Sequence, residues 1–325
     1  MIRRLGRSGI EVTPIALGTM MFGTWGNTDE SECRRMVDAA VDAGVTLFDT
    51  ADIYDDGTSE RILGEALRGK RDRVVLATKV GNPMGGDPER SGLSRRWVTQ
   101  ACEDSLRRLA VDHIDLYQLH RPDPNVPIGE TLLALGDLVA AGKVRAIGTS
   151  TFSAVQLREV VDTATALGGP VPTSEQPPYS ALARGIERDV LDVCRTEDLG
   201  VIVWAPLNGG WLTGKYQAGS TDPDNRANRQ GEHFDHKDEA VRAAKLAAVD
   251  ALTTIAAEHG MTITQLALAF VLDDPTVTAA IIGPRTLDQL SELLAAGTPS
   301  LPPGAREQID AVVAPGHNIN PADAG

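Results

Sequence analysis

Short apolar runs alternate with longer amphipathic stretches along most of the chain. The apolar runs are rich in Val, Ile and Leu, as in strands that are buried on both faces of a sheet. In the amphipathic stretches, apolar residues recur every three or four positions and a glycine often follows, which indicates capped helices. The expected strands are residues 15–18, 45–48, 74–78, 114–119, 144–149, 172–176, 201–205 and 279–282.

An amphipathic helix is expected after each of these strands. Strands that alternate with helices at intervals of about 30 residues pair in parallel, because each helix serves as a crossover. The seventh strand is followed by a longer insertion, which contains a polar stretch at residues 220–238 and two helices. The expected helices are residues 29–43, 59–68, 94–109, 128–141, 153–167, 187–198, 239–259, 262–273, 286–296 and 303–313.

Eight such units match a closed (β/α)8 TIM barrel in length and in number. The alternative is an open, doubly wound α/β sheet, which usually carries a GxGxxG motif after its first strand. No such motif follows residues 15–17. We therefore expect one domain, residues 1–325, built as a TIM barrel. An N-terminal β-hairpin at residues 2–13, the insertion after the seventh strand and a C-terminal helix complete the expected fold.

Charge and composition narrow the class of protein. The formal net charge is −14 and the pI is about 4.9, whereas nucleic-acid binding needs a basic face. The three cysteines show neither zinc nor disulfide spacing, which is typical of a reducing compartment. Residues 1–6 lack the apolar core of a signal peptide, and no apolar run is long enough to span a bilayer. We expect a cytoplasmic protein with no nucleic-acid, membrane or metal partner; the sequence does not indicate an oligomeric state.

Four chemically versatile side chains fall at the ends of neighbouring expected strands. Asp49 and Tyr54 follow the second strand, Lys79 ends the third, and His120 follows the fourth. In TIM barrels the carboxyl ends of the strands form the functional face. We therefore expect these four groups to converge on one pocket that handles protons.

Several motifs around these residues resemble one known family, and they occur in its order along nearly the whole chain. The chain resembles the aldo-keto reductases, in particular the bacterial members related to potassium-channel β subunits. The motifs are Phe48-Asp49-Thr50-Ala51-Asp52-Ile53-Tyr54, Thr78-Lys79, Leu119-His120-Arg121-Pro122-Asp123, Ile147-Gly148-Thr149-Ser150, Trp204-Ala205-Pro206-Leu207, Leu212-Thr213-Gly214-Lys215-Tyr216, Ile282-Gly283-Pro284-Arg285 and Gln289-Leu290.

The resemblance implies reversible, NADPH-dependent reduction of an aldehyde or ketone, possibly derived from a sugar. Hydride transfer to a carbonyl carbon leaves charge on the oxygen, so a placed proton donor is needed. Tyr54 would be that donor, and the Lys79 cation would lower the pKa of its phenol. Asp49 would hold Lys79, and His120 would orient the substrate oxygen. Trp25, Tyr54 and His120 would contact the substrate.

The resemblance also implies a cofactor site without a Rossmann motif. NADP(H) is favoured because Arg285 would pair with the 2′-phosphate of the adenosine, although NAD(H) stays possible. Tyr179 would stack on the nicotinamide, and the other residues would contact its carboxamide, the pyrophosphate or the adenosine. The expected cofactor contacts are Gly18, Thr19, Met20, Asp49, Ser150, Thr151, Gln176, Tyr179, Trp204, Ala205, Pro206, Leu207, Lys215, Arg226, Gly283, Arg285, Gln289 and Glu292.

The chain departs from the family pattern at a few of these positions. Asp55 and Asp56 stand where a glycine usually follows the tyrosine, and Thr151 stands where an asparagine is usual. Ala205 and Leu293 replace a common serine and an asparagine. Two other functions stay open: a regulatory subunit that binds NADPH with little turnover, and an unrelated barrel lyase or isomerase. The latter would leave the 204–216 and 282–292 motifs unexplained.

Overall fold

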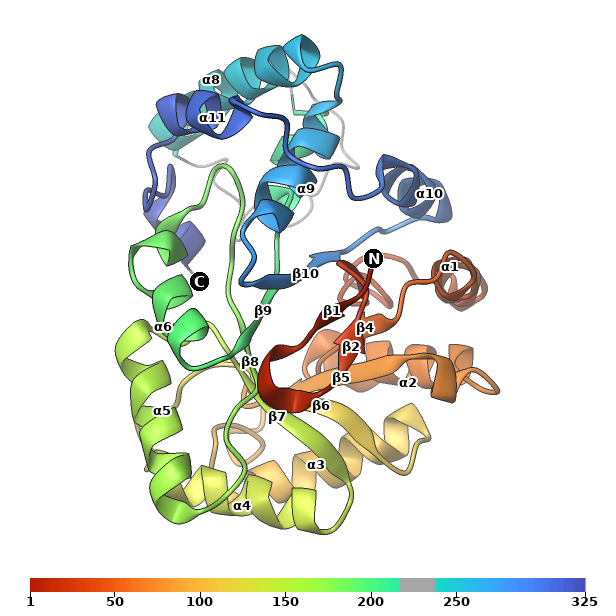
Figure 1. Ribbon diagram of the computed structural model, residues 1–325. Helices are drawn as coiled ribbons and strands as arrows, with labels where there is room; N and C mark the ends of the chain where they lie inside the picture. Colours follow the sequence, from red (N-terminus) through yellow and green to blue (C-terminus); the bar gives the residue numbers. More distant parts are fainter. Residues whose placement is uncertain (217–237, 325) are drawn as a thin grey trace.

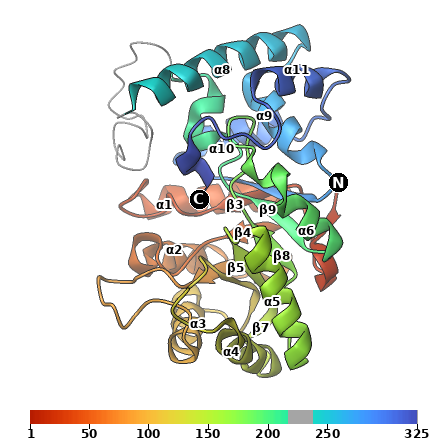
Figure 2. The same ribbon diagram turned by 90° about the vertical axis from the view of Figure 1, so that its left-hand side faces the viewer.

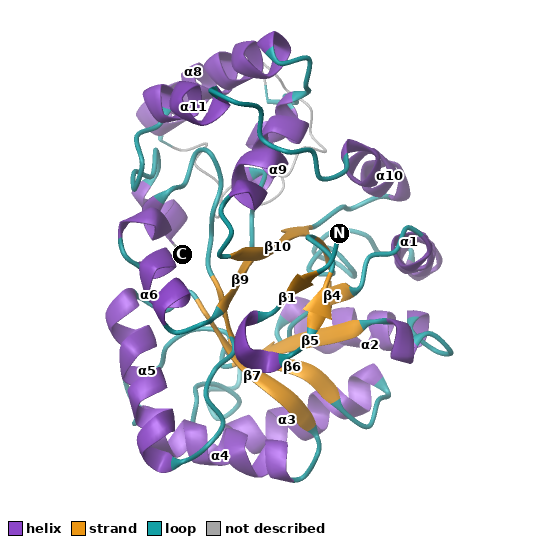
Figure 3. Ribbon diagram, viewed as in Figure 1, coloured by secondary structure: helices purple, strands orange, loops and turns teal. Residues whose placement is uncertain are grey.

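Eight parallel strands close into a barrel, and helices pack around its outside (Figures 1 and 3). The computed structural model describes residues 1–216 and 238–324. The strands follow one another around the barrel in the order β10-β3-β4-β5-β6-β7-β8-β9, so the (β/α)8 fold expected from the sequence is confirmed. They are β3 (Ile15–Gly18), β4 (Leu47–Asp49), β5 (Val75–Val80), β6 (Ile114–Leu119), β7 (Val144–Ser150), β8 (Ser174–Gln176), β9 (Gly200–Val203) and β10 (Val277–Ile282).

The helices lie close to their expected positions. The exception is the expected helix at 187–198, which is shorter because the backbone at Asp189 is not helical (φ −157°, ψ −30°) and separates a 3-10 turn, Gly185–Arg188, from α6. Two helices, α8 and α9, follow β9, and α8 lies beside the C-terminal helix α11 (Figure 2). The helices are α1 (Glu30–Asp42), α2 (Thr58–Ala66), α3 (Arg95–Leu109), α4 (Ile128–Ala140), α5 (Ala154–Leu167), α6 (Val190–Thr196), α8 (Glu239–Glu258), α9 (Ile263–Asp273), α10 (Leu287–Ala296) and α11 (Ala305–Val312).

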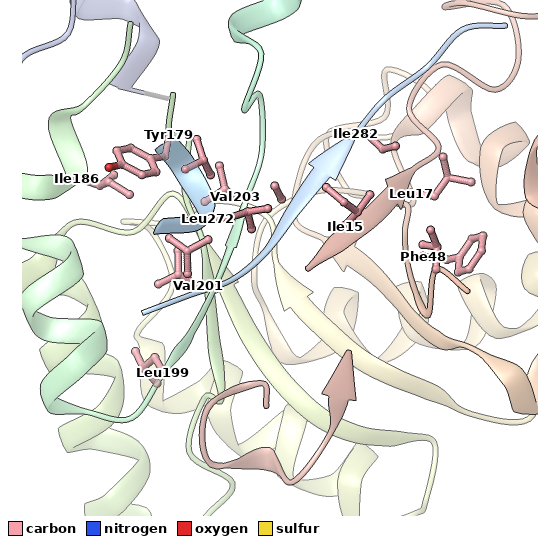
Figure 4. Packing of buried hydrophobic residues seen from close by; sticks show 14 of the residues in the cluster. Ile15, Leu17, Phe48, Tyr179, Ile186, Leu199, Val201, Val203, Leu272 and Ile282 are labelled. Atoms are coloured by element: carbon pink, nitrogen blue, oxygen red, sulfur yellow. The ribbon is translucent and has the colours of Figure 1, made fainter. Parts of the chain in front are cut away.

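The pleat of the strands separates two hydrophobic cores. Successive side chains on a strand point to opposite faces. On β3, Ala16 packs inside the barrel whereas Leu17 packs in the outer layer beneath the helices. Figure 4 shows part of this outer layer, which includes Leu17, Phe48 and Val203. The inner core is small because mainly Ala and Leu side chains fill it.

A β-hairpin closes the N-terminal end of the barrel. Its strands, β1 (Arg3–Arg4) and β2 (Glu11–Val12), pair antiparallel, and Leu5 between them is fully buried in the inner core. The Arg3 guanidinium donates hydrogen bonds to the carbonyl oxygens of Val277 (2.6 Å) and Leu272 (2.9 Å). This end is therefore filled, and only the carboxyl ends of the strands are left to form a site.

Among residues 1–216 and 238–324, no single helix is long and apolar enough to cross a bilayer. The helices α8 and α9 pass that test only when they are taken together, and they are bent by 90° relative to each other.

Candidate active site

Inward-facing side chains at the carboxyl ends of the strands form a polar layer above the apolar inner core. On β4 the inward positions are Leu47 and then Asp49, and on β5 they are Ala77 and then Lys79. On β6 the same two-residue step leads from Leu116 to a polar residue, and on β7 and β8 the last inward position is also polar. The polar members of this layer on the three strands are Gln118, Ser150 and Gln176.

Lys79 is almost completely buried, with only 1% of its surface exposed, and each of its three N–H groups has an acceptor. Its Nζ donates to Asp49 Oδ1 at 2.5 Å, to the carbonyl oxygen of Thr50 at 2.8 Å and to Tyr54 Oη at 3.2 Å. Burial acts to lower the pKa of Lys79, but Asp49 and Tyr54 outweigh it and the pKa is raised. The ammonium therefore stays charged inside the barrel.

The second carboxylate oxygen of Asp49 accepts hydrogen bonds from two side-chain amides. Gln176 Nε2 donates to Asp49 Oδ2 at 2.8 Å, and Gln118 Nε2 donates to the same oxygen at 3.1 Å. Gln176 Nε2 also donates to Gln118 Oε1 at 3.1 Å. Gln118 is a site residue that the sequence reasoning missed. Its position two residues before His120, on the same face of β6, was the available signal.

Tyr54 lies between three other groups at the mouth of the barrel. Its ring centroid is 5.9 Å from that of His120 at an edge-on angle of 80°, and 6.1 Å from that of Trp25. Lys79 Nζ lies 4.9 Å from the centre of the Tyr54 ring. Because Tyr54 Oη accepts a hydrogen bond from Lys79, its own hydrogen is available for another acceptor. Trp25 is 37% exposed and forms part of the outer wall.

Burial raises the pKa of the Tyr54 phenol, and the Lys79 cation, which acts to lower it, does not overcome burial. The expectation that Lys79 brings this pKa below its usual value is therefore wrong for the protein without ligands. Burial, together with the charges of Lys79 and Arg121, lowers the pKa of His120 well below its ordinary value. At neutral pH, Tyr54 keeps its proton and His120 is uncharged.

A second buried acid lies beside the site without adding a charge to it. Asp52 is fully buried, and no side chain among the described residues donates a hydrogen bond to either of its carboxyl oxygens. Burial and the nearby Glu60 raise the pKa of Asp52 to about 8. Glu60 itself is ionically paired with Arg108 at 2.6 Å. Asp49 is therefore the carboxylate that balances Lys79, while Asp52 is mostly protonated at neutral pH.

Four of the residues that depart from the family pattern have a strained backbone. Asp55, Asp56, Thr151 and Ala205 have φ values of 48°, 50°, 58° and 53°, in the left-handed region that costs a residue with a side chain roughly 1–2 kcal/mol. Glycine and asparagine, which are usual at positions 55 and 151, adopt this conformation more readily. All four positions lie at the carboxyl ends of strands, so the strain is concentrated around the mouth of the barrel.

The Asp55 side chain compensates for part of this strain by fastening a neighbouring loop. Its Oδ2 accepts a hydrogen bond from the Thr24 backbone N–H at 2.9 Å, and its Oδ1 accepts one from the Thr24 hydroxyl. A side chain at Gly23 would collide with Asp55, since a Cβ there would lie 2.2 Å from Asp55 Oδ2. The loop that carries Trp25 is thus held against the loop that carries Tyr54.

Side chains suited to a nicotinamide surround the polar layer. Both amide hydrogens of Gln176 are bound inside the barrel, and its Oε1 has no partner among the residues that the structure describes. The Ser150 hydroxyl donates to the Gln176 carbonyl at 2.9 Å and can still accept. Trp204 is partly buried against the inner core, just beyond the end of β9. Met20 is also partly exposed, whereas Gly18 and Thr19 are buried.

Tyr179 does not fit its expected role. Only 1% of its surface is exposed, its hydroxyl donates to Glu187 Oε1 at 2.6 Å, and its ring centroid lies 5.5 Å from that of Phe270. Figure 4 shows it beside Ile186 in the outer hydrophobic layer. A side chain enclosed in this way offers no ring face to a ligand. Trp204 is the aromatic residue at the inner edge of this part of the barrel.

The expected adenosine end lies where two loops meet. Asn27 Nδ2 donates to the Arg285 carbonyl at 2.8 Å, and Gln289 Oε1 accepts from the Arg285 N–H at 2.9 Å. A cavity of about 230 Å³ opens here. Glu292, on α10, is exposed; the expected contact Arg226 and most of the 220–238 stretch lie outside the described residues. The cavity is lined by Gly26, Asn27, Thr28, Glu32, Arg285 and Thr286.

Comparison with known proteins identifies the family. A model described as "Aldo/keto reductase family" matches residues 14–314. The chain belongs to the aldo/keto reductase family. The resemblance stated from the sequence motifs is therefore confirmed.

Similar aldo/keto reductase relatives carry both enzyme and channel-subunit names. "Probable voltage-gated potassium channel subunit beta" of Oryza sativa subsp. japonica is 35% identical over 322 residues, which cover 96% of each chain. "Aldo-keto reductase YhdN" of Bacillus subtilis (strain 168) is 39% identical over 293 residues, 88% of this chain and 85% of the relative. "L-glyceraldehyde 3-phosphate reductase" of Escherichia coli (strain K12) is 31% identical over 299 residues, 89% and 85% of the two chains.

Membership of the aldo/keto reductase family and the reductase names of two relatives support carbonyl reduction as the reaction class. Within the part of the chain that the structure describes, no group of three His, Cys, Asp or Glu side chains could hold a metal ion.

Proposed function

We propose that this protein reduces an aldehyde or ketone with NADPH, and that Tyr54 donates the proton to the carbonyl oxygen. The observation that carries the proposal is the buried chain of contacts from Asp49 through Lys79 Nζ to Tyr54 Oη, with distances of 2.5 and 3.2 Å. Burying the Asp49–Lys79 ion pair costs desolvation free energy. The buried pair fixes the position of the Lys79 ammonium, which in turn orients the O–H group of Tyr54.

The proton step follows from these contacts. Lys79 donates to Tyr54 Oη, so the phenol hydrogen is available to a substrate oxygen at the mouth. When Tyr54 gives up this proton, the Lys79 cation stabilises the phenolate that forms. Asp49 keeps Lys79 in place throughout, because both its carboxylate oxygens remain hydrogen-bonded. Bound NADPH would supply the hydride.

His120 would hold the substrate oxygen in line with Tyr54. Its ring is neutral and its Nδ1 is buried with no hydrogen-bond partner in the part of the chain that the structure describes, so we assign its single proton to Nε2. Two donors, the Tyr54 hydroxyl and His120 Nε2, would then meet at one oxygen. The rings of Trp25 and Tyr54 would form the apolar wall for the rest of the substrate.

NADP(H) fits the residues present. The unpartnered Gln176 Oε1 and the Ser150 hydroxyl would bind the nicotinamide carboxamide, and Trp204 would lie against the ring. Arg285, at the 230 Å³ cavity, would pair with a 2′-phosphate. Lys215, exposed beyond β9, would lie near the pyrophosphate.

The direct test is NADPH oxidation by the purified protein, followed by absorbance, across aldehydes, ketones and keto-sugars. We expect turnover of at least one small aldehyde with a kcat of about 0.1–10 per second, in the usual range for enzymes or somewhat below it. Tight NADPH binding without turnover of any carbonyl compound would contradict the enzyme function.

Such a result would favour a second function, an NADPH-binding regulatory subunit. This alternative has its own support, because the match to the rice channel-subunit relative covers 96% of both chains. The intact set of Asp49, Tyr54, Lys79 and His120 favours the enzyme, since a sensor needs no proton donor.

Replacing Arg285 with alanine should weaken NADPH binding by about 10- to 100-fold, the usual effect of losing a charge-assisted contact to phosphate. NADH binding should change by less than about threefold, since NADH lacks the 2′-phosphate. Fluorescence titration of both cofactors measures the two effects. Arg68→Ala removes an exposed charge just after α2, at the opposite end of the barrel, and serves as the control. Equal weakening of both cofactors would exclude Arg285 as the 2′-phosphate ligand.

We further propose that the protein acts in a reducing compartment such as the cytoplasm. Cys33, Cys102 and Cys194 are all buried and unpaired, and burial raises the pKa of the Cys33 and Cys102 thiols to about 12. Thiols in this state need no oxidising environment.

A further inference from the structure

Arg121 is a cation at the mouth of the barrel whose guanidinium has no hydrogen-bond or ion-pair partner among the described residues. It follows His120 directly, and the His120 N–H is bound to the Val80 carbonyl at 2.8 Å, which anchors the start of this loop on β5. The Arg121 side chain is partly buried. Within residues 1–216 and 238–324 it makes no hydrogen bond and no ion pair.

Three other buried or partly buried arginines of the protein do have carboxylate partners. Arg71 reaches Asp115 at 2.7 Å and Arg108 reaches Glu60 at 2.6 Å. Arg184, only 1% exposed, pairs with Glu187 at 2.8 Å. A guanidinium that loses water without gaining a partner is unfavourable. Arg121 therefore differs from these three arginines, whose charges are balanced by carboxylates within the fold.

The carboxylates nearest to Arg121 in the sequence and the site are committed elsewhere. Asp123 accepts hydrogen bonds from the backbone N–H groups of Leu93 and Asn125, both at 2.9 Å. The Glu175 carboxylate is bound by the Thr149 hydroxyl and by a backbone N–H. Asp55 is bound to Thr24, as described above. None of these three carboxylates forms an ion pair with Arg121, so the N–H groups of its guanidinium can still bind an anion from outside the chain.

The charge of Arg121 acts on the same site as Tyr54. It contributes to the low pKa of His120 and acts to lower the pKa of Tyr54. Burial nevertheless lowers the pKa of Arg121 itself, and the attraction of Tyr54 and Glu175 does not compensate for it. The guanidinium has therefore lost water without a compensating attraction from the groups around it, in a protein whose net charge is −14.

We propose that Arg121 binds an anionic group, a carboxylate or a phosphate, on the substrate whose carbonyl is reduced at Tyr54 and His120. The proposal rests on the carbonyl-reductase function and specifies the substrate class: aldehydes or ketones with a negatively charged substituent. Two parallel N–H groups of the guanidinium match the two oxygens of a carboxylate or phosphate. A bound carboxylate or phosphate would supply the ion-pair partner that Arg121 lacks among the described residues.

Matched substrate pairs test this specificity. Succinic semialdehyde is compared with butanal for the carboxylate, and glyceraldehyde 3-phosphate with glyceraldehyde for the phosphate. We expect wild-type kcat/KM to favour the charged member of at least one pair by about tenfold or more. Arg121→Gln should reduce this ratio by about 10- to 100-fold, and Arg121→Lys, which keeps the charge but loses the planar fork, should reduce it less. The substrate pair whose ratio falls in Arg121→Gln shows whether Arg121 binds a carboxylate or a phosphate.

Arg68→Gln is the control for the loss of one positive charge and should leave the ratio unchanged. The proposal is overturned by any of three results in Arg121→Gln: an unchanged ratio, an equal loss of kcat/KM on charged and neutral members, or NADPH binding weakened by tenfold or more. The second result would assign Arg121 to the proton step, and the third would assign it to the cofactor.

Direct binding separates this proposal from the reductase function on which it rests. Wild-type protein and Arg121→Gln are titrated calorimetrically with 4-hydroxybutyrate and with glycerol 3-phosphate. If the wild type reduces no carbonyl compound but binds one of these anions through Arg121, the reductase function fails and the anion site stands. Reduction of neutral and charged aldehydes at equal efficiency, with no Arg121-dependent binding, would instead refute the anion site alone. An inactive protein that binds neither anion would refute both.

Discussion

Replacement of Tyr54 with phenylalanine is expected to lower kcat for aldehyde reduction by about 10²- to 10⁴-fold, the usual contribution of a placed general acid. The variant loses only the hydroxyl that accepts from Lys79 at 3.2 Å, while the ring can keep its contacts with His120 and Trp25. NADPH binding should change by less than about threefold, because Tyr54 acts on the substrate oxygen. Single-turnover oxidation of bound NADPH and a fluorescence titration measure the two quantities.

The matched control for this variant is Tyr117→Phe. Tyr117 is buried on the outer face of β6, and its hydroxyl lies 3.4 Å from the Val98 carbonyl, on the other side of the strand from the site. Its removal should change kcat by less than about threefold. Turnover of Tyr54→Phe at the wild-type rate would exclude Tyr54 as the proton donor, whatever the control shows.

Replacement of Lys79 with methionine is expected to reduce the free energy of unfolding by about 3–5 kcal/mol. The loss arises because Asp49 would remain buried as a carboxylate without its cation. The double variant Lys79→Met, Asp49→Asn should recover much of this stability, since a neutral amide needs no counter-ion and can still bond to Gln118 and Gln176. Urea denaturation with an unchanged m value measures these differences.

The control for this second experiment breaks an ion pair near the surface. Lys70 pairs with Asp38, and their side chains are 31% and 47% exposed, so Lys70→Met should cost less than about 1 kcal/mol. A Lys79→Met variant as stable as Lys70→Met would show that the Asp49–Lys79 pair is not a buried charge balance. A double variant less stable than Lys79→Met alone would contradict the explanation given for the loss.

The barrel was predictable from the sequence because two local signals agreed along the whole chain. Apolar runs marked the strands and amphipathic stretches marked the helices, and their number and order allow few topologies. The strand ends were less predictable. Asp49, for example, was expected in a loop but is the last residue of β4. Pairing with β3 and β5 continues the strand to that residue. The sequence of β4 alone does not indicate how far its neighbouring strands extend.

The parts of the site that the sequence missed depend on contacts between distant segments. Gln118 looked like one polar residue in an apolar strand, and its bonds to Asp49 and Gln176 come from the stagger of three strands around a closed barrel. Tyr179 was misassigned because its orientation is set by Phe270, 91 residues later in the chain. The pKa of Tyr54 was given the wrong direction because the loss of water around a phenol cannot be read from its neighbours in sequence.

The contact between Asp55 and Thr24 separates the outer wall of the site from the residues inside the barrel. Lys79, Asp49 and the two glutamines are fixed by one another inside the barrel, so a change in any one of them disturbs the others. Trp25 is carried by a separate loop, which Asp55 fastens from outside the barrel. Substitutions in the loop that carries Trp25 can therefore change the outer wall of the site while the hydrogen bonds among Lys79, Asp49 and the two glutamines stay intact.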